Sequence, residues 1–261
     1  MKVCCIQMNM ELGCPDKNFG HVAELIQQAV KGRPDVILLP ETWNTGFYPQ
    51  QGLKDMAQGA AERVKAEIGG LAKKHSINII AGSVSDMQDE NVYNTSLVFD
   101  RTGSCTAQYS KTHLFSPMGE NRHYSPGNFL CTFELDGVKA GLIICYDIRF
   151  PELARSLALK GMDVLFVVSQ WPDVRISHLH TLAAARAIEN QAYVVCCNSC
   201  GKAGQTQYGG CSIIINPLGE TITLAGTGEE LLTGEADISA LPNIRSAIPV
   251  FQDMRRELYD L

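Results

Sequence analysis

The sequence predicts an α/β fold in which two packed sheets carry helices on their outer faces. Short apolar runs rich in valine and isoleucine alternate with segments of helical spacing over most of the 261 residues. Several of these runs are apolar on both faces, which is typical of strands buried inside a layered protein. No repeat or low-complexity linker divides the chain, so we expect one domain over 1–261. The number of strands fits two sheets better than one barrel.

The first half of the chain is expected to hold two strand–helix units, a third strand and a hairpin. Strands are predicted where apolar runs are continuous. Helices are predicted where apolar residues recur every three or four positions, as Val22, Leu25 and Ile26 do before the C-capping Gly32. In order, the expected elements are a strand at 2–9, a helix at 22–30, a strand at 35–41, a helix at 60–75, a strand at 77–84 and a hairpin at 92–111.

The second half repeats the strand–helix theme and ends in hairpins. An apolar run precedes a helix that Gly161 ends, and two further apolar runs flank a second helix. The expected elements are a strand at 137–145, a helix at 151–160, a strand at 163–169, a helix at 176–190, a strand at 192–198 and hairpins at 211–225 and 230–238.

The last twenty or so residues differ in pattern from the rest of the chain. From about residue 238, Pro242 and Pro249 interrupt scattered apolar residues such as Ile248, Val250 and Phe251. This pattern favours an arm that packs at a subunit interface over another core element.

Charge and composition exclude several classes of partner. The net charge of -6 and the pI near 5.5 argue against nucleic acid or an anionic membrane as the main partner. No stretch approaches the roughly 18 apolar residues that a membrane span requires. The ten cysteines occur in a chain too large to need a disulfide framework, and several lie in apolar runs. We therefore expect a reducing, cytoplasmic location.

Three reactive side chains are predicted at the ends of strands. The second, fifth and sixth expected strands end at Glu41, Lys111 and Cys145. In open α/β sheets, sites form beyond the carboxyl ends of the strands, so a carboxylate, an ammonium and a thiol should converge. A lone charged residue at a strand end is more often a solvated charge, and a cysteine in an apolar run is more often core filler. The occurrence of all three at corresponding ends favours a site.

These residue types together suit nucleophilic catalysis. A free thiol has a pKa of about 8.5, so a nucleophilic cysteine needs a base or a positive neighbour. Glu41 is expected to accept the thiol proton, and Lys111 to favour the thiolate and stabilise the oxyanion formed at an attacked carbonyl. The sharp strand-to-helix turn after Cys145 would also present the backbone N–H of Tyr146 to that oxyanion.

Several motifs resemble the nitrilase superfamily of carbon–nitrogen hydrolases. LLPETWNTGFYP (38–49), YSKTHLF (109–115) and GLIICYDIRFPELA (141–154) are similar to the three signature blocks of that family, in the same order. The segments 119–128 and 171–195 are also similar to it. The similarity covers nearly the whole chain up to the last hairpin. One block alone would be a weak signal, but three in order are specific.

The resemblance implies a fold, an assembly and a set of catalytic residues. It implies a four-layer α-β-β-α sandwich that pairs into homodimers or larger homo-oligomers. It also implies that Glu41, Lys111 and Cys145 are catalytic, with Glu120 as a fourth member. The motifs CYDIRFPE and AIENQ are most similar to the ω-amidase and deaminated-glutathione amidase branches.

We therefore expect an amidase without a cofactor that converts a small amide to an acid and ammonia through a cysteine thioester. One alternative is an N-carbamoyl amide hydrolase, which would also release carbon dioxide. Another is a non-catalytic binding partner built on the same fold. The presence of all four implied catalytic residues speaks against a non-catalytic protein.

Two residues after the strand at 163–169 are candidates for binding the rest of the substrate. Trp171 offers an apolar wall, and Arg175 offers a planar fork suited to a carboxylate. An equally weighted alternative is that Arg175 is a solvated residue at the start of the next helix. If Arg175 binds a carboxylate, the substrate is an amide with an acid at its far end.

Metal and redox sites are not expected. His178 and His180 are two residues apart, so on a helix they face different directions, and Cys197 and Cys200 lack a second matched pair. The two cysteines follow a strand rather than begin a helix, which argues against a redox motif.

The residues around the turn after Cys145 are expected to be structural. His113 could serve as the base of a cysteine protease, but nothing else completes such a pattern, so a packing or hydrogen-bonding role is favoured. Asp147 and Arg149 are expected to brace the turn, and Asp147 also to cap the following helix.

Overall fold

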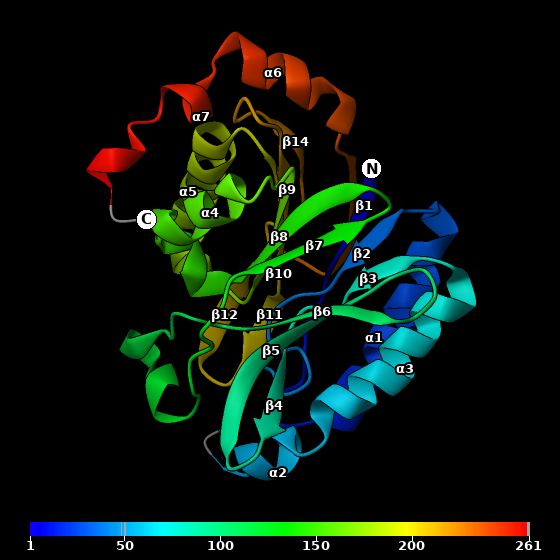
Figure 1. Ribbon diagram of the computed structural model, residues 1–261. Coiled ribbons are helices and arrows are strands. Elements are labelled where there is room, and N and C mark those ends of the chain that lie inside the picture. The colour runs from blue at the N-terminus through cyan, green and yellow to red at the C-terminus, as the bar shows by residue number, and fades with distance from the viewer. Residues whose placement is uncertain (48, 50, 260–261) are drawn as a thin grey trace.

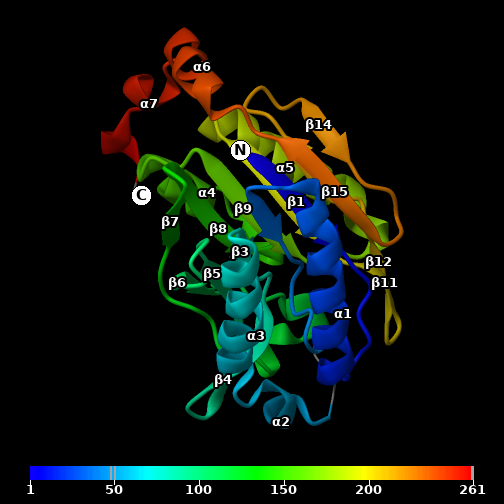
Figure 2. The same ribbon diagram turned by 90° about the vertical axis from the view of Figure 1, so that its right-hand side faces the viewer.

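The computed structural model describes residues 1–47, 49 and 51–259, and it has four layers. Two sheets pack face to face, and a layer of helices covers the outer face of each (Figures 1 and 2). The predicted α-β-β-α sandwich is therefore confirmed. None of the helices in the described part combines the length and apolar character needed to cross a membrane.

The first sheet holds most strands of the N-terminal half and one strand from near the C-terminus. Its order is β15-β1-β2-β3-β5-β4, with β6 beside β5, and β1, β2 and β3 are parallel. The strands are β1 (Lys2–Gln7), β2 (Val36–Leu38), β3 (Asn78–Ile80), β4 (Val84–Gln88), β5 (Asn91–Phe99), β6 (Cys105–Ser110) and β15 (Glu230–Glu235).

The second sheet has the order β14-β13-β10-β9-β8-β7, with β8, β9 and β10 parallel. Its strands are β7 (Cys131–Leu135), β8 (Val138–Ile144), β9 (Val164–Ser169), β10 (Tyr193–Asn198), β13 (Ile213–Ile215) and β14 (Thr221–Leu224). A separate hairpin consists of β11 (Cys200–Ala203) and β12 (Thr206–Gly209).

Each sheet buries its outer face under two long helices. Apolar residues of α1 and α3 pack on the first sheet, and those of α4 and α5 pack on the second. The long helices are α1 (Pro15–Ala29), α3 (Ala60–His75), α4 (Pro151–Leu159) and α5 (Ile176–Asn190); the short ones are α2 (Leu53–Ala57), α6 (Leu241–Ala247) and α7 (Val250–Asp253).

The strand period of two divides the core into layers. In β8, Leu142 and Ile144 face the other sheet, whereas Ile143 between them faces α4 and α5. The same alternation in β5 points Val98 between the sheets and Leu97 towards α1 and α3. Both faces of these strands are therefore apolar, which explains their nearly continuous hydrophobic runs.

Several segments differ from the expected elements. The helix expected at 22–30 begins earlier, as α1 (Pro15–Ala29), and β7, β11 and β12 were not expected. The strand expected at 77–84 ends at Ile80, because Gly82 has a φ of +58° and a Cβ there would lie 2.0 Å from the carbonyl oxygen of Pro40. The chain bends at this point and continues in the same direction as β4, since β3 and β4 both pair antiparallel with β5. The segment 230–238 contains one strand rather than a hairpin. This strand, β15, pairs antiparallel with β1 and buries Leu232 between the sheets.

The C-terminal arm packs against the helices of the second sheet. Figure 1 shows α6 and α7 near α4 and α5, and Phe251 of α7 packs on the apolar cluster that these longer helices share. Gln191, which follows α5, donates from Nε2 to the carbonyl oxygen of Ile248 over 2.8 Å. Residues 260–261 lie outside the described part of the arm. Its place at a subunit interface stays a prediction.

Candidate active site

The predicted reactive residues meet where the strands end. Lys111 directly follows β6, Cys145 directly follows β8, and Glu41 lies three residues after β2. β2 and β6 run in the same direction, because β3 is parallel to β2 and antiparallel to β5, and β5 is antiparallel to β6. The expectation of a shared edge therefore agrees with the geometry.

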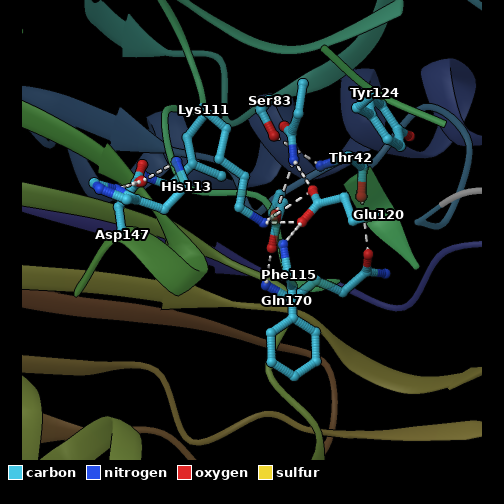
Figure 3. Close-up of polar contacts among 12 residues, drawn as sticks. Thr42, Ser83, Lys111, His113, Phe115, Glu120, Tyr124, Asp147 and Gln170 are labelled. Carbon is cyan, nitrogen blue, oxygen red and sulfur yellow. Dashed lines mark hydrogen bonds and ion pairs between the residues drawn. The ribbon is translucent and has the colours of Figure 1, made fainter. Parts of the chain in front are cut away.

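Cys145 occupies a strained turn. It begins a 3₁₀ helix, η4 (Cys145–Arg149), and its φ of +48° lies in the left-handed region that residues with a side chain rarely adopt. The buried carboxylate of Asp147 accepts from the backbone N–H of Ile144 at 3.0 Å and from that of His113 at 2.9 Å. Asp147 thus ties the turn to the segment after β6, and Figure 3 shows it beside His113.

Asp147 does not cap the next helix, contrary to expectation. Phe150 is the N-cap residue of α4, and no side chain caps that end. The Asp147 carboxylate is instead used by Ile144, His113 and the hydroxyl of Tyr109, which donates to it over 2.7 Å. These hydrogen bonds occupy both carboxylate oxygens of Asp147, so neither oxygen is available to cap α4.

A buried ammonium lies between two carboxylates. Lys111 Nζ is 2.8 Å from Glu41 Oε1 and 2.9 Å from each carboxylate oxygen of Glu120 (Figure 3). The exposed fraction is 1% for the Lys111 side chain and 0% for both glutamates. Burial disfavours the ammonium, but attraction to Glu41 and Glu120 outweighs it and raises the pKa of Lys111. Lys111 is therefore charged at neutral pH.

The Glu41 carboxylate also faces the thiol. Glu41 Oε2 accepts from the backbone N–H of Gln170 at 2.8 Å, and the Cys145 thiol is a hydrogen-bond partner of the same carboxylate. Burial raises the pKa of Glu41, with Lys111 opposing the shift. Burial and the nearby Glu41 charge raise the pKa of the Cys145 thiol far more than Lys111 lowers it. The resting cysteine is therefore a thiol with a carboxylate base beside it.

A pocket opens onto Cys145 and Lys111. Its lining also includes the three other residues singled out from the sequence for the oxyanion and the substrate, namely Tyr146, Trp171 and Arg175. Trp171 is 3% exposed, and its Nε1 donates to the carbonyl oxygen of Arg175 at 2.8 Å. This contact holds the indole as one wall of the pocket.

Two guanidinium groups lie over aromatic walls of this pocket. Arg175 Cζ lies 5.4 Å from the ring centroid of Phe115, and Arg149 Cζ lies 5.0 Å from that of Trp171. Arg149 was expected to brace the turn, but it lines the pocket instead. Together the two arginines favour a negatively charged group in this pocket.

Three contributors were not anticipated from the sequence. Asn94 of β5 donates from Nδ2 to Glu41 Oε1 and to Glu120 Oε1. The backbone N–H groups of Gln170 and Phe115 donate to Glu41 and Glu120, the latter over 2.6 Å. A backbone N–H carries no residue-type signal. Asn94 lies within a predicted strand whose buried face was not assigned.

The candidates for a metal or redox site lie apart. Within the described residues, no group of three or more His, Cys, Asp or Glu side chains is placed to hold a metal ion. His180 Nε2 pairs with the carbonyl oxygen of Cys211 at 2.9 Å, and His178 Nδ1 lies 3.4 Å from Arg149. Cys197 donates to the carbonyl oxygen of Ile6. That the protein needs no metal or cofactor stays a prediction.

Comparisons with known proteins agree with this geometry. A family model described as carbon-nitrogen hydrolase matches residues 2–246. The chain is 38% identical to the 2-oxoglutaramate amidase of Bacillus subtilis (strain 168), over 98% of each chain. It is 44% identical to a protein named hydrolase in agr operon from Staphylococcus lugdunensis, over 86% of this chain and 97% of that protein. The crystal structure of Saccharomyces cerevisiae Nit3, of the nitrilase superfamily, superposes with a TM-score of 0.90 at 29% identity, covering 98% of this chain and 96% of that one.

Proposed function

Because this chain belongs to the carbon–nitrogen hydrolase family, we propose that it is an amidase that hydrolyses a small carboxylate-bearing amide to an acid and ammonia. The observation that carries the proposal is the contact between the Cys145 thiol and the buried Glu41 carboxylate, in a pocket that also holds Arg175. The thiol can lose its proton only to a nearby base, and the arginine offers a site for the second functional group of the substrate.

The first half of the reaction forms a thioester. Glu41 takes the proton of Cys145 as the sulfur attacks the amide carbon. The oxyanion is stabilised by Lys111 and by the backbone N–H of Tyr146, at the first turn of η4 where N–H groups lack helical partners. The protonated Glu41 then gives its proton to the leaving nitrogen, which departs as ammonia when the C–N bond breaks.

The charges of the site suit this order of reaction steps. All three N–H groups of the Lys111 ammonium are directed at carboxylate oxygens in the resting protein. When Glu41 becomes neutral, its hold on Lys111 weakens at the moment the oxyanion appears. Lys111 can then turn one N–H to the new negative charge while Glu120 retains the rest.

The second half of the reaction releases the acid. Glu41, again a carboxylate, removes a proton from water as the water oxygen attacks the thioester carbon. The C–S bond breaks, and the sulfur recovers the proton from Glu41. Glu120 keeps Lys111 in place through both halves, and we assign it that positioning role.

The two arginines of the pocket lining support the proposed substrate class. Arg175 and Arg149 place positive charge in the pocket that Cys145 also lines, so an acid group on the substrate has charged partners there. An ω-amide of a keto-dicarboxylate carries such an acid group. The name of the Bacillus subtilis relative, 2-oxoglutaramate amidase, supports such an amide as the first compound to assay.

The test compares two amides of equal length, succinamate and butyramide, in the parent and in Arg175→Gln. Loss of one charge-assisted contact costs about 1.5–3 kcal/mol, so kcat/KM for succinamate should fall roughly ten- to a hundredfold. kcat/KM for butyramide should stay nearly constant. Ammonia release measures both. Arg122→Gln is the control, because Arg122 is exposed and its loss changes the net charge equally.

An equal fall for both amides, or no fall for either, would remove Arg175 as the carboxylate partner. Carbon dioxide released together with ammonia from a carbamoyl compound, at a higher kcat/KM than for any amide, would replace the amidase assignment with an N-carbamoyl hydrolase.

A further inference from the structure

Asn94 closes a ring of hydrogen bonds around the two buried glutamates. Its Nδ2 lies 2.9 Å from Glu41 Oε1 and 3.2 Å from Glu120 Oε1. Lys111 Nζ contacts the same two oxygens at 2.8 and 2.9 Å. The ring therefore alternates two donors, Asn94 and Lys111, with two acceptors. Figure 3 shows the Lys111–Glu120 side of this ring.

The partners of Asn94 determine the orientation of its amide. With the amide reversed, its oxygen would face two carboxylate oxygens and repel both. In the observed orientation, Nδ2 serves both glutamates, while Oδ1 is buried with no hydrogen-bond partner among the described residues. An unpaired buried carbonyl lowers the stability of the fold. Asn94 therefore destabilises the protein in a way that an apolar residue at this position would not.

The backbone fixes Asn94 relative to Lys111. The N–H of Lys111 donates to the carbonyl oxygen of Asn94 at 2.9 Å, so β5 and the end of β6 hold the two donors in register. Asn94 does not belong to the lining of the pocket. It therefore acts on the site through the glutamates and not through the substrate.

We propose that Asn94 is a positioning residue that reserves Glu41 Oε2 for proton exchange with Cys145. The inference rests on the proposed function of Glu41 as the base. Oε1 of Glu41 accepts from Asn94 and from Lys111, so it has little capacity to take a proton. Oε2 accepts one hydrogen bond, from the backbone N–H of Gln170, and is therefore the oxygen left to receive the proton of the thiol. Asn94 also prevents a proton from being shared directly between Glu41 and Glu120, as two close carboxylates otherwise tend to do.

Removing the amide donor changes the protonation of the site in a defined direction. Glu41 faces Lys111, Glu120 and Cys145, with Tyr124 also near. Without Asn94 the negative form of Glu41 loses one donor, while the repulsion from Glu120 remains. The proton is then bound more tightly and is no longer directed to Oε2.

The test measures the alkylation of Cys145 by iodoacetamide across pH, followed by intact mass, in the parent, Asn94→Ala and Asn94→Asp. With Glu41 removing the thiol proton as the sulfur is alkylated, the pH midpoint reports the ionisation of Glu41. It should rise by about 1–2 units in Asn94→Ala, because the Glu41 carboxylate has lost one hydrogen-bond donor. Asn94→Asp keeps the shape of the side chain but adds a negative charge, so its midpoint should rise at least as far. A role limited to filling space predicts instead that Asn94→Ala keeps the parent midpoint.

Turnover gives a second, separate readout. On the amide that the parent hydrolyses, kcat of both variants should fall roughly tenfold or more with KM nearly unchanged, since Asn94 does not touch substrate. Ser96→Ala is the matched control. Ser96 is fully buried two residues along the same strand, and its hydroxyl has no partner among the described residues.

The outcomes separate this inference from the proposed function. Failure of the parent to hydrolyse any amide would reject the amidase, while the alkylation midpoints would still test Asn94. A thermal unfolding midpoint equal to the parent's shows that a variant is folded, and one folded variant is enough for the comparison. A folded variant with the parent's alkylation midpoint and kcat would overturn the positioning role, as would an equal shift in Ser96→Ala.

Discussion

Cys145 combines two features that are costly for a residue outside a functional site. Its φ of +48° costs roughly 1–2 kcal/mol for a residue with a side chain. Its thiol is desolvated beside a carboxylate, which raises the pKa of the thiol instead of lowering it. A cysteine activated as a free thiolate would need the opposite environment. In the proposed mechanism, the thiol therefore depends on Glu41 at each turnover.

The positions of the candidate reactive side chains could be predicted from the sequence, but their supporting contacts could not. Glu41 and Cys145 each follow an apolar run, Lys111 ends the second strand of a predicted hairpin, and strand ends gather. Asn94 could not be predicted, because Asn94, Thr95 and Ser96 are consecutive polar residues and the pattern does not say which face of the strand meets the site. Arg149 was assigned to the turn because its long side chain gives no direction from sequence.

At the level of elements, one arginine makes several of the polar contacts that hold the C-terminal arm. Arg245 of α6 pairs with Asp163 at 2.8 Å and donates to the carbonyl oxygens of Met162 and Gln191. Both charged side chains are largely buried, with exposed fractions of 29% and 19%. The arm therefore owes its position to specific polar contacts in addition to apolar packing.

We expect Arg245→Ala to lower the free energy of unfolding by about 1–3 kcal/mol, because it leaves buried acceptors without their donor. Thermal unfolding should report a fall in midpoint of roughly 2–4 °C per kcal/mol. Arg255→Ala is the control, since the Arg255–Glu257 pair is exposed, at 66% and 60%. Equal midpoints for the two variants would contradict the role given to Arg245.

Some elements could have been predicted and others could not. β7 was not expected, although Asp136 and Gly137 after it both have positive φ and form the type of Asp-Gly turn that signals a hairpin. The end of β3 was beyond sequence patterns, because it depends on the contact of Gly82 with the distant Pro40 loop. The pairing of β15 was also beyond sequence patterns, because its partner is the distant strand β1 and not a strand joined to it by a short turn.

At the scale of the whole molecule, one surface is more apolar than a soluble monomer requires. Ile188, Leu218 and Ile248 are 53%, 58% and 64% exposed, and they line a hollow of 570 Å³ between α5 and the arm. All ten cysteines are free in the structure, and the reducing, cytoplasmic location stays a prediction. We still predict that this surface is covered by a second copy of the chain, in a homodimer formed through the arm.

Light scattering at micromolar concentration should give at least the mass of a dimer for the parent. Ile248→Asp should shift the distribution towards monomer, because it places a charge at the centre of the expected contact. Val174→Asp, at an exposed apolar residue of the same chain (78%), should not. A monomeric parent would refute the prediction, and an unchanged mass for Ile248→Asp would exclude this surface.

The most direct test of the central claim is the mass of the protein quenched in acid during turnover. Parent and Glu120→Gln are mixed with the hydrolysed amide, quenched at a series of times and compared by intact mass and peptide mapping. The account predicts an added mass equal to the substrate less one ammonia, located on Cys145 and absent in Cys145→Ala. Ammonia release at the parent rate by Cys145→Ala, or an acyl group mapped to another residue, would contradict it.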